Sequence, residues 1–249
     1  QWSSSAASDV YKRQIAMLRR NPNDRRAVLQ MWDVKEDLDR DGKDVPCNTN
    51  IYFKVRDKKL NMTVCNRSND MLWGAYGANA VHMSMLQEYL ASRLEIAVGE
   101  YTQISDSFHV YQNDVWERCK ELGVIDIYSW RSTKNDYEYI KQKDLVPLIT
   151  HSKTFQWELD LFFEAFNDVI TTGELFSTKE YTGPIKTFQN PSIRDIAIPM
   201  VNAYMFHKHR QYEDSYAWIN KIKAYDWMKA CFEWVRRRDI TFTLKIADN

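Results

Sequence analysis

The chain has 249 residues, of which 44% are hydrophobic and 14% aromatic, and it is long enough to bury a sizeable core as one domain or as one domain with an appendage. Its 34 basic residues are balanced by 34 acidic ones, which gives a formal net charge of zero. Because no overall charge would attract a polyanion or an anionic surface, we expect neither a nucleic acid polymer nor a membrane as a partner.

The cysteines and histidines show no pattern that would bind a metal. None of the four cysteines belongs to a Cys-x-x-Cys pair or has a histidine at ligand spacing, and most histidines lack carboxylate or cysteine partners. The cysteines are Cys47, Cys65, Cys119 and Cys231. No stretch is apolar enough to span a bilayer. The sequence therefore predicts a cytoplasmic protein with free thiols and no metal.

The first 14 residues are set apart from the rest of the chain. The run from Trp2 to Gln14 resembles a translated sequencing-adaptor read, and it has no apolar stretch of the kind that a secretory signal contains. We therefore treat residues 1–14 as a non-native segment. We also expect the natural N-terminal part of the protein to be missing from this chain.

A β-hairpin is the clearest element that the sequence predicts. Residues 50–55 and 60–64 alternate β-branched or aromatic side chains with polar ones, and residues 57–59 make the bend between them. Before this hairpin, the apolar run at residues 27–32 is short enough to be a buried strand.

Reactive and charged side chains stand at the two ends of the hairpin. Cys47 comes just before its first strand, and the cluster of Arg67, Ser68 and Asp70 comes just after its second. A twisted hairpin can bring both ends to one face. A nearby guanidinium favours the thiolate form of a cysteine, so this grouping predicts a site that holds an anion while a sulfur attacks.

The hairpin is followed by a loop, a helix and a strand. Gly74 and Gly77 predict a tight loop, and apolar residues recur at helical spacing over residues 80–94 with Asn79 in front of them. Residues 105–111 alternate so that the side chains of His109 and Tyr111 would share one face of a strand.

These motifs occur together in the order of a known family. Pro46-Cys47, the run Asn66-Arg67-Ser68-Asn69-Asp70, then Gly74, Asn79 and His109-Val110-Tyr111 resemble the catalytic core of thymidylate synthases and their pyrimidine hydroxymethylase relatives. The segment from Asn21 to Arg26, followed by Trp32-Asp33, is similar to the double-arginine segment of that family. The match covers roughly residues 19–115 and departs from the family pattern at Asn48, where many members have His, and by one extra residue before Asn79.

The resemblance implies a role for each matching residue. Cys47 would be the nucleophile that adds to C6 of a uracil ring, and Asp70 would contact folate. The nucleotide would be bound by the arginines, the hydroxyl groups, the amide and the imidazole of the motifs. These residues are Arg25, Arg26, Arg67, Ser68, Asn79, His109 and Tyr111. In the family the double arginine reaches into the partner subunit's site, so the resemblance also implies a homodimer.

The residues by themselves leave other readings open. Arg25 and Arg26 are also typical of a solvated surface pair, and a lone cysteine such as Cys47 is often a small buried apolar group. Asp70 and Asn79 are also typical helix caps.

The resemblance implies transfer of a one-carbon unit from 5,10-methylenetetrahydrofolate to C5 of dUMP, as a thymidylate synthase-type methyltransferase performs it. The alternative is a dUMP or dCMP hydroxymethylase, in which water replaces the hydride of folate in the last step. A third possibility is a nucleotide-binding fragment without turnover, because the proton-handling Glu of the family normally lies upstream of Arg25.

We expect an α+β fold, with a thymidylate-synthase-like mixed sheet packed on helices in residues 15–115 and a mainly helical region in residues 116–249. The second face of the sheet is expected to form the dimer surface. Trp218, Trp227 and Trp234 are interpreted as core residues. Helices are predicted at residues 115–122, 155–170, 195–209 and 215–238, with a terminal strand at residues 240–246.

Overall fold

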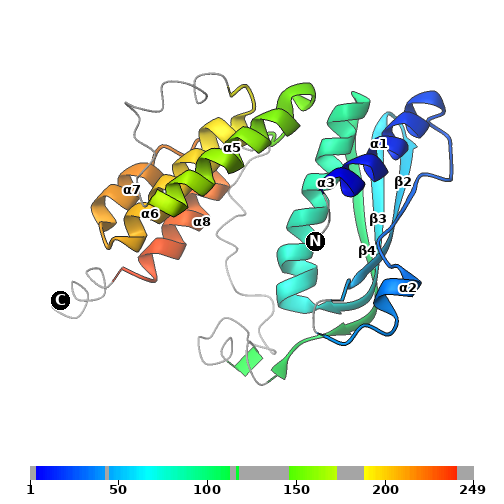
Figure 1. Cartoon of the computed structure of the whole chain (residues 1–249), viewed down its shortest axis with the longest axis horizontal. Helices are drawn as coiled ribbons and strands as arrows, with labels where there is room; N and C mark the ends of the chain where they lie inside the picture. Colours follow the sequence, from blue (N-terminus) through cyan, green and yellow to red (C-terminus); the bar gives the residue numbers. More distant parts are fainter. Residues whose placement is uncertain (1–3, 43–44, 113–115, 118–145, 173–187, 240–249) are drawn as a thin grey trace. The chain divides into compact units, whose positions relative to one another are not determined.

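The computed structural model describes residues 4–42, 45–112, 116–117, 146–172 and 188–239 (Figure 1). The chain divides into two compact units, Gln1–Thr133 and Lys134–Asn249. The division predicted at residues 115 and 116 stays a prediction, because the chain around it lies largely outside the described residues.

The first unit contains a mixed four-stranded sheet. Its strands are β1 (Val28–Gln30), β2 (Asn48–Arg56), β3 (Lys59–Asp70) and β4 (Ala97–His109), and they lie side by side in this order. β1 and β2 pair antiparallel, as do β2 and β3, whereas β3 and β4 pair parallel. Asp57 and Lys58 form the hairpin bend with φ angles of 49° and 56°, the left-handed region that tight hairpin turns use. The predicted hairpin and the predicted α+β class are confirmed.

Helices α1 (Ser4–Arg20) and α3 (Asn79–Leu94) cover one face of this sheet (Figure 1). The inward side chains of β2 and β3 are almost fully buried, as are those of Leu18 in α1 and Leu90 in α3. The inward residues are Ile51, Phe53, Leu60, Met62 and Val64. Complete burial of one such side chain contributes roughly 1.5–3 kcal/mol, so this layer supplies most of the stability of the unit.

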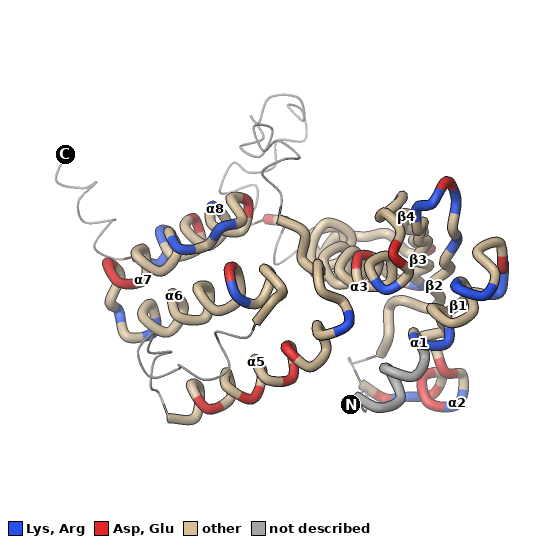
Figure 2. The backbone as a smooth tube through the Cα atoms, turned by 90° about the horizontal axis from the view of Figure 1, so that it is seen from above, with Lys and Arg blue, Asp and Glu red and all other residues tan. Residues whose placement is uncertain are grey.

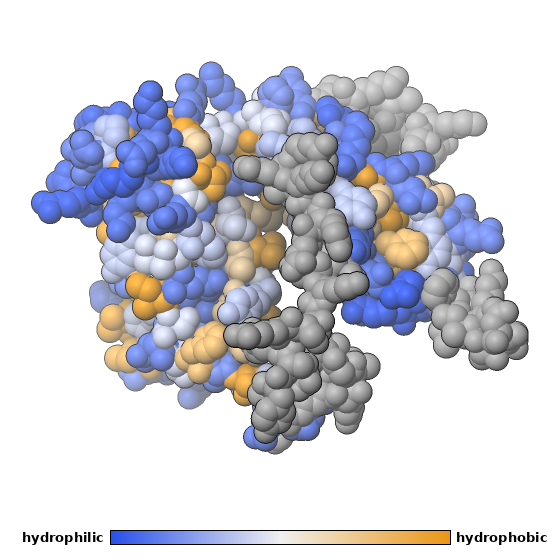
Figure 3. Space-filling view, turned by 180° about the vertical axis from the view of Figure 1, so that it is seen from behind, coloured by the Kyte–Doolittle hydropathy of each residue, from blue (hydrophilic) through white to orange (hydrophobic). Residues whose placement is uncertain are grey.

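The opposite face of the sheet carries mainly polar residues with a few apolar residues among them. Tyr52, Thr63 and Thr102 lie in one row across β2, β3 and β4, and Asn50, Cys65 and Ile104 lie in the next. The side chain of Ile104 is 54% exposed and that of Tyr52 is 38% exposed. Hydrophobic patches are visible among hydrophilic residues on the molecular surface (Figure 3).

Two features of this unit differ from the sequence-based expectation. The strand expected at residues 105–111 begins at Ala97 and ends at His109, so Tyr111 lies beyond it. The expected loop around Gly74 and Gly77 is a π-helical segment, η1 (Met71–Ala78). The connection after residue 33 begins with a short helix, α2 (Val34–Asp37), which Asp33 caps. Residues of the segment predicted to be non-native form the first part of α1, and whether that segment is native stays untested.

The described part of the second unit is helical. It contains α5 (Ser152–Thr172), the π-helical η5 (Ser192–Ala197), α6 (Ile198–Lys208), α7 (Tyr212–Ile219) and α8 (Tyr225–Arg236). Acidic residues recur along α5, and basic residues gather towards the end of α8 (Figure 2). No helix in the described ranges is long and apolar enough to cross a bilayer.

Two predicted helices of this unit are divided in the structure. The helix expected at residues 215–238 is interrupted between α7 and α8, where Ile222 and Ala224 are buried in the core. Burial of these two side chains therefore overrides a helical pattern that continues through the sequence. The helix expected at residues 195–209 begins as η5 and continues as α6. The helix expected at residues 115–122 lies outside the described residues except for residues 116–117, and the strand expected at residues 240–246 lies wholly outside them.

A buried carboxylate connects α5 to the chain that enters η5. Glu158 is fully buried, and it accepts hydrogen bonds from the hydroxyl of Thr154 and from the backbone N–H groups of Gln189 and Asn190. Burial alone would raise the pKa of Glu158, but these hydrogen bonds together lower it below its usual value. The carboxylate thus stays ionised and ties two segments that are 31 residues apart.

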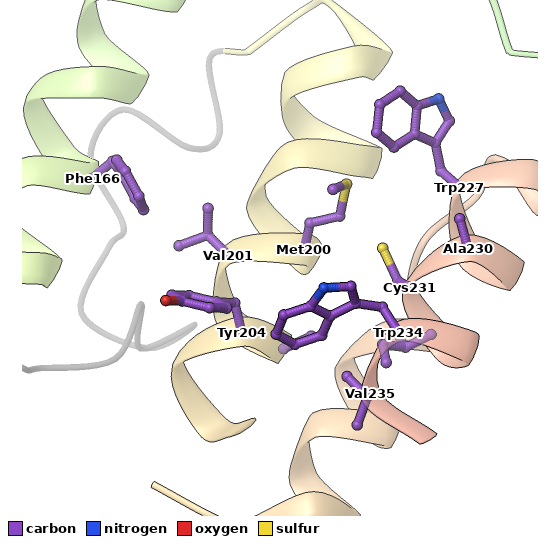
Figure 4. Close-up of a pocket in the computed structure, with 11 residues that line it drawn as sticks. Phe166, Met200, Val201, Tyr204, Trp227, Ala230, Cys231, Trp234 and Val235 are labelled. Atoms are coloured by element: carbon purple, nitrogen blue, oxygen red, sulfur yellow. The ribbon is translucent and has the colours of Figure 1, made fainter. Parts of the chain in front are cut away.

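The helical unit also has an apolar pocket of about 440 Å³ that is open to the surface (Figure 4). Trp227, Cys231 and Trp234 of α8 and Met200 and Tyr204 of α6 are among the side chains that line it. Burial raises the pKa of the Cys231 thiol to about 11, so this thiol is protonated at neutral pH and packs as an apolar group, as predicted. Trp218, Trp227 and Trp234 are partly buried against the core of the unit, which confirms that part of the prediction.

Candidate active site at one edge of the sheet

The topology brings the predicted site residues of the sheet to a single edge. β2 begins where the antiparallel β3 ends, and β4 ends at the same edge because it runs parallel to β3. Cys47 precedes β2, Ser68 and Asp70 lie at the end of β3, and His109 lies at the end of β4. The expectation that the two ends of the hairpin meet is therefore confirmed.

Arg67 fixes the backbone next to Cys47. The backbone N–H of Arg67 donates to the carbonyl of Cys47 at 2.9 Å. Its guanidinium donates to the carbonyls of Pro46 at 2.9 Å and Val45 at 3.2 Å, and it lies over the ring of Trp32 at 5.3 Å from the centroid. A guanidinium has five N–H donors, so Arg67 can bind an anion in addition to these two carbonyls.

Cys47 is exposed at this edge, and its Sγ lies 4.0 Å from the carbonyl oxygen of Val45. A thiol beside an arginine at the surface is placed as a nucleophile must be, whereas a structural thiol would be buried. Cys65 in β3 and Cys231 in α8 are both half-buried. Cys119 lies outside the described residues.

Two buried side-chain amides belong to the residues next to Cys47 and Arg67 in the sequence. Asn48 and Asn66 face each other in the β2 and β3 register and are 7% and 3% exposed. Among the described residues, neither side-chain oxygen has a hydrogen-bond donor. Buried polar atoms are nearly always paired, so a bound molecule, a water or a residue outside the described ranges is needed to complete them.

The ends of β3 and β4 place further candidates beside one another. Ser68 pairs with Ser107, and Asp70 pairs with His109, in the parallel register. The Nδ1 atom of His109 lies 3.2 Å from the carbonyl oxygen of Ser107. The rings of His109 and Tyr111 meet edge to face at 5.1 Å, although Tyr111 lies past the end of the strand. The two side chains are therefore neighbours, but through ring contact and not through strand alternation.

Asp70 caps the helix that follows it. One of its oxygens, Oδ1, accepts from the backbone N–H groups of Leu72 and Trp73, and the second oxygen takes part in neither bond. Trp73 and Tyr76 of η1 expose 65% and 74% of their surface. The capping alternative for Asp70 is thus realised, and the cap uses only one of its two carboxylate oxygens.

Asn79 begins α3, and its side chain points to a neighbour that the sequence analysis did not single out. Its Nδ2 donates to Oδ1 of Asn69 at 3.1 Å. Asn69 is 1% exposed and contacts Gln103 and Ser105 of β4. η1, which contains the extra residue before Asn79, is kinked at Gly77, whose φ and ψ of −118° and −125° are not helical.

The two arginines of the double-arginine segment differ in their surroundings. Both are exposed in the connection between α1 and β1. Arg26 forms a two-point ion pair with Asp24, with distances of 3.0 and 2.8 Å, and its hydrogen bonds lower the pKa of Asp24 to about 2. Arg26 therefore already has a carboxylate partner, which leaves Arg25 as the better candidate for binding a phosphate.

In the described residues, no group of three or more His, Cys, Asp and Glu side chains is arranged to hold a metal ion.

The edge of the sheet thus combines a thiol, the guanidinium group of Arg67, a hydroxyl, an amide and a carboxylate, as an enzyme for a phosphorylated, hydrogen-bonding substrate requires. The family model for thymidylate synthase matches residues 1–124. A deoxyuridylate hydroxymethyltransferase of Pseudomonas phage M6 is 35% identical over 99% of this chain and 67% of its own length. The chain belongs to the thymidylate synthase family.

Other relatives match less than half of the chain. A deoxyuridylate hydroxymethyltransferase of Bacillus phage SP01 is 40% identical over 45% of this chain, which spans 29% of that protein. A putative thymidylate synthase of Methanosarcina barkeri is 37% identical over 43% of the chain, which spans 48% of that protein.

Solved structures similar to this chain include the thymidylate synthase of T4 phage and thymidylate synthase A of Bacillus subtilis. The first has a TM-score of 0.39 and 26% identity and covers 45% of this chain and 38% of its own. The second has a TM-score of 0.40 and 25% identity and covers 46% of this chain and 40% of its own.

Proposed function

We propose that the protein transfers a one-carbon unit from 5,10-methylenetetrahydrofolate to C5 of dUMP and releases the 5-hydroxymethyl product. The observation that carries this proposal is the exposed Cys47 held beside Arg67 at the edge of the sheet. The similarity to the phage M6 hydroxymethyltransferase covers 99% of the chain, including the helical unit. That extent favours transfer of a hydroxymethyl group. Our first expectation was transfer of a methyl group.

Cys47 is proposed to form the covalent bond on which the reaction depends. Its Sγ adds to C6 of the pyrimidine, and the electron pair of the C5–C6 double bond moves towards C5 and the C4 carbonyl oxygen. C5 then bonds to the one-carbon unit and loses its proton, and the bond between that carbon and the folate nitrogen breaks, so that tetrahydrofolate leaves. When the bond between Sγ and C6 breaks, the double bond is restored and the product leaves.

The remaining site residues are proposed to hold the nucleotide in place. Arg67 and Ser68 bind its phosphate, because a guanidinium fork matches a phosphate in charge and geometry. Asn79 presents an acceptor and a donor to N3–H and the C4 carbonyl of uracil. His109 and Tyr111 hydrogen-bond the 3′-hydroxyl of the deoxyribose.

The residues around Asp70 fit a bound folate. A carboxylate oxygen outside the cap and the exposed rings of Trp73 and Tyr76 offer a hydrogen-bond acceptor and flat apolar surfaces for a fused ring. When bound, methylenetetrahydrofolate supplies the carbon at the oxidation level of formaldehyde. Water then completes a hydroxymethyl group, whereas hydride would complete a methyl group.

A homodimer is part of the proposal. Arg25 is exposed at the end of the sheet unit and, in this proposal, binds the phosphate in the partner subunit's site. The open face of the sheet, with Tyr52 and Ile104, is the proposed contact between the subunits.

Mass spectrometry of the nucleotide product tests the reaction. The chain is incubated with dUMP and methylenetetrahydrofolate, and a hydroxymethyl product is expected, which is heavier than a methyl product by one oxygen. The Cys47→Ser variant should form no product, while the Cys65→Ser variant should retain activity. A methyl product would favour the thymidylate synthase reaction, and full activity of Cys47→Ser would remove the proposed nucleophile.

A further inference from the structure

Three side-chain amides form a chain of hydrogen bonds beneath the proposed base site. Asn79 Nδ2 donates to Asn69 Oδ1 at 3.1 Å, and Asn69 Nδ2 donates to Gln103 Oε1 at 3.1 Å. Asn69 Nδ2 also lies 3.0 Å from the hydroxyl of Ser105, and Gln103 Nε2 donates to the backbone carbonyl of Ala75 at 2.9 Å. Gln103 and Asn69 thus each use their oxygen towards one neighbour and their nitrogen towards the next, and Asn79 contributes its nitrogen.

The carbonyl of Ala75 determines the orientation of all three amides. A backbone carbonyl can only accept, so Gln103 must turn its nitrogen to Ala75 and its oxygen to Asn69. Asn69 must then turn its nitrogen to Gln103 and its oxygen to Asn79. Asn79 must in turn direct its nitrogen to Asn69. A reversed amide at any position would place two acceptors or two donors against each other.

Gly74 leaves room for this arrangement. A Cβ atom at position 74 would lie 2.3 Å from Oδ1 of Asn69 and 3.1 Å from Nδ2 of Asn79. Since Asn69 is 1% exposed, its amide has no access to solvent as an alternative partner. The hydrogen bonds to β4 and Asn79 are therefore its means of satisfying its polar atoms.

The fixed orientation has a consequence for base recognition. The bond to Asn69 uses one of the two N–H groups of Asn79, so the carbonyl oxygen and the second N–H remain to face a pyrimidine. That pattern is complementary to N3–H and O4 of uracil. Rotation of the amide by 180° would give the reversed pattern, which is complementary to N3 and the amino group of cytosine.

We propose that Asn69 is a positioning residue that makes the site specific for uracil, by holding the amide of Asn79 in one orientation through the chain of hydrogen bonds from Ala75, Gln103 and Asn69. This inference rests on the proposed role of Asn79 in binding the base. Asn69 itself does not touch the nucleotide.

Calorimetric binding of three ligands to the chain tests the inference. The ligands are dUMP, dCMP and 2-deoxyribose 5-phosphate, which has no base. In Asn69→Leu, which keeps the volume but removes the acceptor, the preference for dUMP over dCMP should fall at least tenfold, while the affinity for the base-free phosphate stays within twofold. Asn61→Leu makes the same change at the other end of β3 and should alter neither quantity.

Each outcome decides between the inference and the function on which it rests. An unchanged preference in folded Asn69→Leu, or an equal loss of affinity for all three ligands, would overturn the positioning role. If Asn69→Leu does not fold, the double variant Gln103→Met, Ser105→Ala releases the amide of Asn69, and an unchanged preference there is equally decisive. A parent chain that binds dUMP no better than dCMP would contradict the proposed uracil reading itself, and the inference would fall with it.

Discussion

Arg67 has two tasks in the proposed site. Its guanidinium holds the Val45 and Pro46 carbonyls and stacks on Trp32, and it is proposed to bind the nucleotide phosphate as well. Arg67→Ala should weaken dUMP binding by about 1.5–3 kcal/mol, the usual contribution of a hydrogen bond to a charged group. This corresponds to a Kd that is roughly 10- to 150-fold higher in a calorimetric titration.

Two further variants control for the charge of Arg67 and for the loss of an arginine elsewhere on the sheet. Arg67→Lys keeps the charge but loses the planar fork, so its dUMP affinity should lie between those of the parent chain and Arg67→Ala. Arg56→Ala removes an exposed arginine next to the hairpin bend, far along β2 from Cys47, and should bind dUMP normally. Equal binding by Arg67→Ala and Arg56→Ala would show that Arg67 has no contact with the phosphate.

Single residues differ in how far the sequence reveals them. Cys47 and Arg67 could be predicted as neighbours, because a hairpin brings its two ends together whatever surrounds it. Asn69 could not, because its partners Gln103 and Ser105 are more than 30 residues away on a strand that pairs in parallel. The only local sign is a polar residue at a buried position of β3, and that sign does not identify its partners.

At the scale of elements, Gln87 joins α3 to two strands. Its buried Nε2 lies 2.8 Å from the carbonyl of Leu60, 3.0 Å from that of Glu100 and 3.3 Å from that of Gly99. The β3 and β4 register shifts at this point, between Leu60 and Met62, so these carbonyls lie beside an irregularity in the ladder. The side chain of Gln87 thus supplies hydrogen bonds that a regular strand pair would make by itself.

Gln87→Met keeps the length of this side chain and removes its donors. The carbonyls that it serves would then be buried without a donor, so the free energy of unfolding should fall by about 1–3 kcal/mol. Urea denaturation followed by circular dichroism measures the change. Ser84→Met places the same residue on the exposed side of α3 and should change stability by no more than about 0.5 kcal/mol. Similar midpoints for the two variants would contradict the importance of this contact.

Elements with local signals were predicted well, and elements shaped by packing were not. The alternation and the bend of the hairpin are visible in the sequence itself. β4 begins eight residues before the predicted strand. The prediction missed these residues because Gly99 and the exposed Val98 interrupt the expected alternation. A Cβ at Gly99 would lie 2.0 Å from Oδ1 of Asn61, so this glycine is required by the close approach of β3.

At the scale of the whole molecule, the sheet face opposite α1 and α3 is the proposed contact surface for a second subunit. Its rows across β2, β3 and β4 mix polar residues with the exposed side chains of Tyr52 and Ile104. An isologous contact would bury the same surface of both subunits, as closed dimers do. The sequence predicts apolar residues on both faces of these strands, but it does not show what covers the second face.

Ile104→Lys should convert the proposed dimer into a monomer, because each subunit would then bury an unpaired charge in the contact. Sedimentation velocity measures the state of assembly. Val81→Lys introduces the same charge at an exposed apolar position of α3, away from that sheet face, and should leave the dimer intact. A parent chain that sediments as a monomer would contradict the proposed contact.

Because Arg25 is proposed to act in the partner's site, Arg25→Ala should weaken dUMP binding in the dimeric chain and have no effect when combined with Ile104→Lys.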